Sequence, residues 1–139
     1  MLEDTDGFRE CRDCLCFAVR RAARAVTQHY ERHLRPAGLR ATQFSVLVRL
    51  AQTGPMPINR LASQMGLERT TLSRNLRPLV AKRWIAVSEE ADRRVHSVAI
   101  TAKGRAIARE ALPAWRKAQA SAKKKLGALH LEALAAAVR

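Results

Sequence analysis

A three-residue break, Gly66-Leu67-Glu68, separates two segments that both have the apolar periodicity of a helix. The first segment, residues 59–65, is short, and the second covers residues 69–82. The apolar face of the second segment consists of Leu72, Leu76, Leu79 and Val80. A glycine in so short a break allows a tight turn, so the two helices must meet at a steep angle. The spacing predicts a helix-turn-helix.

The other face of the second helix carries polar and cationic side chains suited to a DNA groove. They are Arg69, Thr70, Thr71, Ser73, Arg74 and Arg77. Arginine can bind guanine with two hydrogen bonds, and Ser or Thr can bond a base or a phosphate. We expect this helix to lie in a major groove of duplex DNA. Two helices that only pack into a hydrophobic core and expose a basic face to solvent would have the same pattern, because short helix-turn-helix matches are common by chance.

A β-hairpin is predicted directly after these helices. Two short runs with alternating apolar residues, 84–88 and 95–100, flank the polar segment Glu89-Glu90-Ala91-Asp92-Arg93-Arg94. A basic β-ribbon beside a helix-turn-helix is typical of a wing, and Arg93 and Arg94 at its tip are suited to a minor groove. The hairpin favours DNA binding over the plain helix pair.

The predicted fold class is mainly α with a small β-hairpin (α+β), as one domain over residues 1–139. The DNA-binding lobe should span residues 42–100 and begin with Thr42 as N-cap. Helical segments 10–35 and 102–138 are longer than such a lobe needs. The second starts after the N-cap Thr101 and should bend at Pro113. The apolar residues of its end are Leu129, Leu131, Leu134 and Val138. They need a second copy to pack on, so we expect interleaved N- and C-terminal dimerisation helices.

The net charge indicates an anionic partner. The chain has 26 basic and 12 acidic residues, a net charge of +14, and domains this basic most often bind nucleic acid. Residues 101–139 have nine basic and two acidic residues, a net +7. Aromatic residues are 4% of the chain, too few for a single-strand stacking platform. A nonspecific, architectural nucleic-acid binder that uses only the charge stays the alternative to a sequence-specific regulator.

The sequence disfavours several other classes of protein. No apolar run approaches the ~18–20 residues that span a bilayer, and the acidic N-terminus lacks the order of a secretory signal. A cytoplasmic protein without membrane contact is expected. The chain has no Gly-rich phosphate loop, no nucleophile motif and no paired acids outside the hairpin. We therefore expect neither an enzyme nor a cofactor.

Three cysteines, Cys11, Cys14 and Cys16, lie within six residues. An odd number at this spacing does not suit a disulfide framework, so they should be thiols. They could be packing residues, redox sensors near the arginines of the same helix, or ligands of a soft metal or metalloid. His29 and His33 share a helix face, but such a pair is more often solvated than a metal site.

The sequence resembles the MarR family of winged helix-turn-helix regulators over roughly residues 11–138. Four stretches carry the resemblance: Ile58-Asn59-Arg60-Leu61-Ala62, Gly66-Leu67-Glu68-Arg69-Thr70-Thr71-Leu72-Ser73-Arg74, Asp92-Arg93-Arg94 and Ile100-Thr101-Ala102-Lys103-Gly104. The resemblance implies a homodimer on a pseudo-palindromic operator, usually a repressor released by a ligand or an oxidant. It also implies that Arg94 enters a minor groove and that Asp92 holds the wing arginine. Arg83 stands where the family often has Gly, so we predict a different helix-to-wing turn.

Cys16 and Tyr30 resemble the organic-hydroperoxide-sensing branch of that family. The branch implies that Cys16 is the sensor thiol and that Tyr30 of the opposite subunit holds it. Within one helix these residues are 14 positions, or ~21 Å, apart and cannot touch. The branch has a second Tyr where this chain has Ala41, so only one thiol-binding hydroxyl is present. Cys11 or Cys14 could resolve an oxidised Cys16 into a disulfide.

Overall fold

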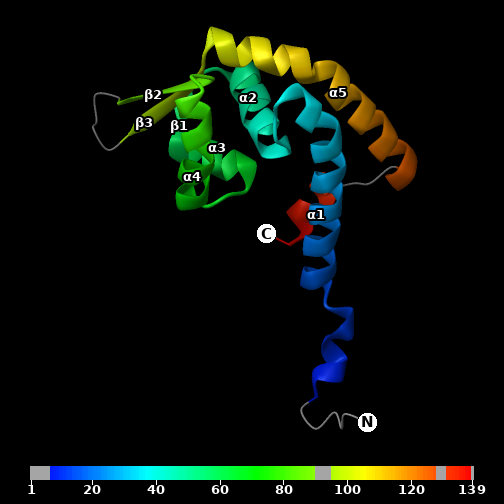
Figure 1. The fold of residues 1–139 in the computed structure, drawn as a ribbon. Helices are drawn as coiled ribbons and strands as arrows, with labels where there is room; N and C mark the ends of the chain where they lie inside the picture. The colour runs from blue at the N-terminus through cyan, green and yellow to red at the C-terminus, as the bar shows by residue number, and fades with distance from the viewer. Residues whose placement is uncertain (1–6, 90–94, 128–130, 139) are drawn as a thin grey trace.

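A computed structural model describes residues 7–89, 95–127 and 131–138 of the chain. In chain order the elements are η1 (Phe8–Asp13), α1 (Leu15–Leu34), η2 (Arg35–Ala37), α2 (Ala41–Thr53), β1 (Met56–Pro57), α3 (Ile58–Met65), α4 (Arg69–Ala81), β2 (Ile85–Glu89), β3 (His96–Ile100), α5 (Ala102–Leu126) and α6 (Leu131–Ala137). The small antiparallel sheet lies at one side of α2, α3 and α4, and α1 extends away from the lobe that these elements form (Figure 1). The predicted winged helix-turn-helix fold is confirmed.

The sheet has the order β1-β3-β2 and is antiparallel throughout. The predicted hairpin is present, with Val87 opposite Val98 in its register. The third strand, β1, was not predicted. It follows Pro55 and consists of Met56, which pairs with Val98, and Pro57, and it is too short to have an alternating pattern of its own. Only its pairing with β3 makes it a strand.

The hydrophobic core lies in the lobe, between the helix-turn-helix, α2 and the sheet. Residues from four elements are fully buried, each 0% exposed: Leu47, Leu50, Leu61, Leu72 and Val98. Leucines buried this completely contribute about 2–5 kcal/mol each relative to Ala. The core therefore holds α4 in a fixed position against α2, α3 and β2.

Arg83 ends α4 in the left-handed conformation, with φ 58°. The Trp84 N–H donates to the Leu79 carbonyl over 2.9 Å, and the Arg83 N–H donates to the Val80 carbonyl over 2.9 Å. These two bonds form the helix end that usually has Gly at this position. The prediction that Arg would change the turn is wrong, because the two bonds hold it in the strained conformation.

Thr101 is the N-cap of α5, as predicted. Its Oγ1 accepts the Gly104 N–H at 3.0 Å. The backbone of Gly104 also packs closely on the turn before β2. A Cβ at Gly104 would lie 2.0 Å from the Trp84 carbonyl oxygen. The start of α5 is thereby fixed to the helix-to-wing turn.

The structure corrects or refines three features of the helices that the sequence predicts. α1 begins at Leu15 and not at residue 10, since Cys14 has an extended backbone that separates it from η1. α2 begins one residue before Thr42. Arg40 is its N-cap, with its N–H bonded to Gln43 Oε1 at 3.0 Å. α5 continues through Pro113 and changes direction along its length in Figure 1.

The N-terminal half of α1 exposes large apolar side chains. Leu15 is 79% exposed, Phe17 is 62% exposed and Val19 is 48% exposed. The C-terminal half packs on α5, where His29 Nε2 bonds the Ala118 carbonyl at 3.1 Å. None of the described helices is long and apolar enough to cross a membrane.

Candidate nucleic-acid interface

The turn between α3 and α4 is closed by backbone bonds. Gly66 has φ 66° in the left-handed region, where a side chain would be strained. The Leu67 N–H donates to the Ala62 carbonyl at 2.9 Å. Glu68 is then extended and precedes the first residue of α4. Because this turn has fixed geometry, the core position of α3 sets the direction of α4.

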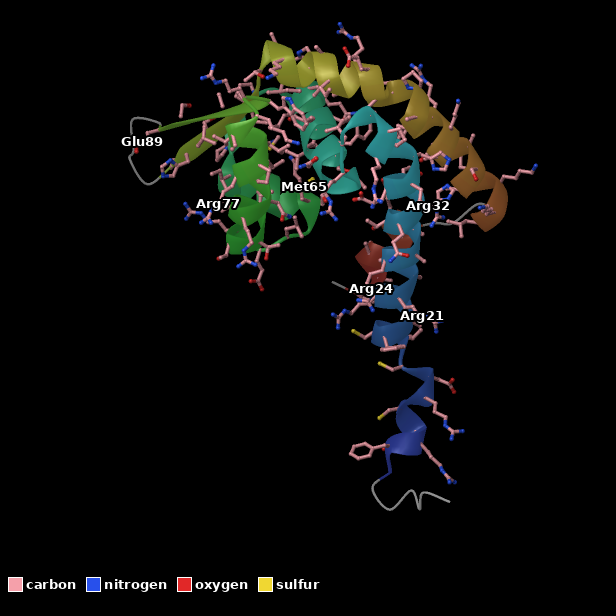
Figure 2. The ribbon with its side chains drawn as sticks, in the orientation of Figure 1. Arg21, Arg24, Arg32, Met65, Arg77 and Glu89 are labelled. Atoms are coloured by element: carbon pink, nitrogen blue, oxygen red, sulfur yellow. The ribbon has the colours of Figure 1, made fainter. Side chains whose placement is uncertain are left out.

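The two faces of α4 divide almost as the sequence predicts. Leu72, Leu76 and Leu79 are buried at 0–3% exposure. The predicted groove-facing residues Arg69, Thr70, Thr71, Arg74 and Arg77 are all exposed, and Ser73 is half-buried. Figure 2 shows Arg77 pointing away from the lobe. The exception is Val80, predicted on the apolar face but 43% exposed.

The arginines of α4 are available to an external anion. Within the part of the chain that the structure describes, Arg69, Arg74 and Arg77 form no ion pair with Asp or Glu. Their charges are therefore not neutralised by the described acidic residues. Unpaired guanidinium groups on an exposed helix face bind phosphate or guanine well, because they offer paired N–H donors.

A groove of about 300 Å³ lies between the N-terminus of α2 and α4. Its polar lining consists of Arg40, Thr42, Gln43, Arg74 and Asn75. Only Arg74 of these was predicted from the sequence. A cation and hydroxyl at the start of α2 are a signal for anion binding, since a helix N-terminus carries partial positive charge. The groove enlarges the cationic surface around α4.

The wing residues are only partly described. β2 and β3 pair in register from Ile85↔Ile100 to Glu89↔His96, so the ribbon extends to the hairpin loop. Asp92, Arg93 and Arg94 lie outside the described residues. Their assigned roles at the wing tip stay predictions.

The three cysteines are exposed and free. Cys11 lies in η1, and Cys16 lies in the first turn of α1. Cys14 has an extended backbone and separates η1 from α1. Their exposure does not support the packing interpretation within one chain. Among residues 7–89, 95–127 and 131–138, no group of three or more His, Cys, Asp or Glu could hold a metal ion. The metal or metalloid interpretation is therefore unsupported.

Tyr30 is engaged within its own chain. Its hydroxyl donates a hydrogen bond to Gln119 Oε1 on α5. Partial burial raises the pKa of Tyr30 above its ordinary value, because desolvation disfavours the phenolate. Beside it, His33 Nδ1 bonds the His29 carbonyl at 2.9 Å. His29 therefore bonds α5 through the Ala118 carbonyl, whereas His33 bonds a carbonyl of its own helix.

Comparisons with known proteins agree with this geometry. The family model described as MarR family matches residues 39–96, which include the helix-turn-helix and most of the hairpin. The chain is 29% identical over 87 residues to an uncharacterised HTH-type transcriptional regulator, YwoH, of Bacillus subtilis (strain 168). That match covers 63% of this chain and 64% of YwoH, less than two thirds of either.

Solved structures match over nearly the whole chain. The M. tuberculosis transcriptional regulator MosR in complex with DNA has 39% identity and a TM-score of 0.79, with 90% of this chain and 92% of that chain covered. The transcriptional repressor CouR bound to a 23-mer DNA duplex has 25% identity and a TM-score of 0.74, with 94% of each chain covered. A mutant MarR from E. coli complexed with operator DNA, at 22% identity and TM-score 0.77, supports the fold alone. The chain belongs to the MarR family of transcriptional regulators.

Proposed function

We propose that this chain is a sequence-specific transcriptional regulator that binds duplex DNA with α4 in the major groove. The observation that carries the proposal is the exposed row of Arg69, Arg74 and Arg77, which pair with no described acidic residue, on a helix fixed by its buried leucines. A rigid α4 presents these donors at constant positions, which base recognition requires. Two similar proteins, MosR and CouR, are described as bound to DNA.

The groove between α2 and α4 supports a second kind of contact. Arg40 and Thr42 sit at the start of α2, on the same groove as Arg74. Contacts from a helix N-terminus to phosphates orient a protein on DNA without reading its sequence. We assign phosphate binding to Arg40 and Thr42, and base reading to the exposed side chains of α4.

The functional unit we propose is a homodimer on an inverted repeat. Large apolar side chains are exposed on α1 and near the C-terminus, including Leu15, Phe17, Leu131 and Val138, at 62–81%. A second copy that covers them would bury apolar area worth roughly 25 cal/mol per Å². Two lobes would then read half-sites about 34–36 Å apart. No catalysis is required, and the site of action would be the cytoplasm.

Selection of bound duplexes from a random pool tests the proposal. The selected pool should contain an inverted repeat that binds at least about a thousandfold more tightly than scrambled duplex. Arg74→Ala should weaken binding to the repeat by about 1–3 kcal/mol and relax the preference at one position. Arg49→Ala removes an exposed cation of α2 outside the groove and is the matched control. Equal binding to every duplex would leave only the architectural alternative.

We further propose thiol oxidation as the signal that releases the DNA. Three exposed free thiols stand on and beside the apolar end of α1, where a dimer would form. A thiolate attacks the O–O bond of a hydroperoxide, takes one oxygen to become a sulfenic acid, and the other oxygen leaves as an alcohol after protonation. A neighbouring thiol then displaces water and forms a disulfide. Such a disulfide would change the backbone conformation at the N-terminus of α1.

Peroxide treatment of three proteins separates this signal from general damage. The wild type should release DNA and gain an internal disulfide by mass analysis. Cys16→Ser should keep its DNA. Cys11→Ser is the matched control, because it retains Cys16 and the other candidate resolving thiol, Cys14, and should still release DNA. Release of DNA from peroxide-treated Cys16→Ser would place the sensor elsewhere.

A further inference from the structure

The largest concentration of charge in the chain lies on α5, far from the recognition surface. The helix has 25 residues, and eight of them are Lys or Arg against the single acid Glu110. The basic residues are Lys103, Arg105, Arg109, Arg116, Lys117, Lys123, Lys124 and Lys125. All eight are exposed. In the described part of the chain none of them forms an ion pair.

Four of these cations form a continuous stripe. Arg105, Arg109, Arg116 and Lys123 are separated by 4, 7 and 7 residues. At 3.6 residues per turn this spacing places them within an arc of about 40°, along a line of about 27 Å. We call these four residues the α5 stripe. The spacing is regular enough to follow a linear polyanion.

The face of α5 that packs on the rest of the chain is centred about 120° around the helix from the stripe. Gly104, Ala108, Ala111, Ala118 and Ala122 are buried there. The small residues allow close approach to α1 and α2, so the stripe is directed outward. Figure 2 shows nitrogen-tipped side chains projecting from the outer side of α5. In Figure 1, α5 runs along one end of the lobe and α4 lies toward the other.

From this arrangement we infer that the α5 stripe is a second DNA-binding surface, which holds the phosphates of another duplex segment and lets one protein molecule bridge two duplexes. Duplex DNA carries one charge per ~1.7 Å of its axis, so a 27 Å line of cations meets several phosphates. Binding there would depend on charge and be independent of sequence.

The composition of the stripe argues against other occupants. A partner protein is usually held by aromatic or apolar anchors at the centre of the interface, and the stripe has none. A membrane surface is usually bound by a helix with apolar residues beside its cations, which insert below the headgroups. Self-association would bring like charges together. Most of the large exposed apolar side chains among the described residues lie on α1 and near the C-terminus, and the one on α5, Leu126 at 46% exposure, lies outside the stripe.

Energy transfer between duplexes tests the inference. Short random-sequence duplexes carrying donor or acceptor dyes are mixed with the full chain at about 50 mM salt. The wild type should bridge the two kinds of duplex and so raise the energy transfer from donor to acceptor dye. Arg109→Gln with Arg116→Gln should reduce bridging and lower the slope of log bridging constant against log salt by about 2, one unit per lost phosphate contact. The difference in anisotropy between a labelled duplex with the selected inverted repeat and a scrambled duplex measures sequence-specific binding through α4 separately.

A charge-matched variant is the control. Lys103→Gln with Lys125→Gln removes two exposed cations from the same helix, outside the stripe, and should keep the wild-type slope. An equal loss of bridging in both double variants would mean that only the net charge matters and would overturn the inference. Unchanged bridging in the Arg109 and Arg116 variant would assign bridging to the two lobes of a dimer and would also overturn it. If that variant has a lower melting temperature, Arg105→Gln with Lys123→Gln removes the ends of the stripe instead.

The inference goes beyond the proposed function and can fail independently of it. Preference for an inverted repeat is measured with one duplex and depends on α4. Bridging is measured with two duplexes and depends on α5. A protein without sequence preference would still show the stripe-dependent slope.

Discussion

The Oγ1 of Thr101 lies 2.7 Å from the carbonyl oxygen of Arg83 and donates a hydrogen bond to it. Arg83 is the left-handed residue between α4 and β2, and Thr101 is the N-cap of α5. One hydroxyl therefore connects the end of the recognition helix, the base of the wing and the start of α5. Changes in this hydroxyl should affect all three.

Removal of the Thr101 hydroxyl should destabilise the fold. Thr101→Ala loses the bond to Arg83 and the cap on Gly104 N–H, a cost of about 1–2 kcal/mol. Thr101→Ser retains the hydroxyl and is the control. The free energy of unfolding from denaturant titration measures both. A Ser variant as unstable as the Ala variant would show that the methyl group, not the hydroxyl, matters.

Arg83→Gly should stabilise the protein. A non-glycine residue in the left-handed conformation costs about 1–2 kcal/mol, and the extra chain entropy of Gly returns part of this. A net gain of about 0.5–1 kcal/mol is expected. Ala81→Gly, at the last residue of α4, should instead lose about 0.5–1 kcal/mol. A lower melting temperature for Arg83→Gly would contradict the strain argument.

Gly104→Ala should be poorly tolerated although Ala favours helices. The new Cβ would lie 2.0 Å from the Trp84 carbonyl oxygen and 3.1 Å from Ile100 Cγ1, so backbone must move. We expect a loss of about 1–3 kcal/mol, typical of overpacking. Ala106→Ser, exposed on the same helix, should change stability by less than about 0.5 kcal/mol. Thermal unfolding of the two variants decides between close packing and general sensitivity of α5.

The pKa of Tyr30 predicts a loss of stability in alkali. Its pKa is raised from 10.0 in the folded chain by desolvation, so above pH 10 the unfolded state loses the proton first. Fewer protons bound in the unfolded state mean that stability falls as pH rises. Tyr30 is the one tyrosine of the chain, so the absorbance of the phenolate reports the ionisation of this residue alone. Tyr30→Phe should show a shallower alkaline decline, and identical slopes would contradict the assignment.

Arg94→Ala should weaken binding to the selected inverted repeat without changing the free energy of unfolding. The resemblance assigns this residue to the minor groove, where a guanidinium gains from the negative potential. We expect a loss of about 1–3 kcal/mol in binding. Arg35→Ala, an exposed cation beside α1, is the charge-matched control. Unchanged affinity would remove Arg94 from the interface.

Local sequence determined the elements to which we assign DNA reading. Leu72, Leu76 and Leu79 repeat at helical spacing, and Gly66 permits the turn, so both faces of α4 were predictable. The cap at Thr101 was predictable for the same reason, because its partner Gly104 is three residues away. Periodicity and capping depend on neighbours within a turn or two of the chain.

Only the tertiary structure decided the features that join distant segments. β1 exists because Met56 pairs with Val98, and the groove beside α4 exists because Arg40 lies near Arg74. Arg83 adopts a strained conformation that its own preference opposes, since the surrounding bonds outweigh it. Such outcomes depend on contacts between residues far apart in the chain, which the local pattern does not encode. The sequence by itself therefore determined which face of α4 is polar and exposed, and the packing decided what surrounds it.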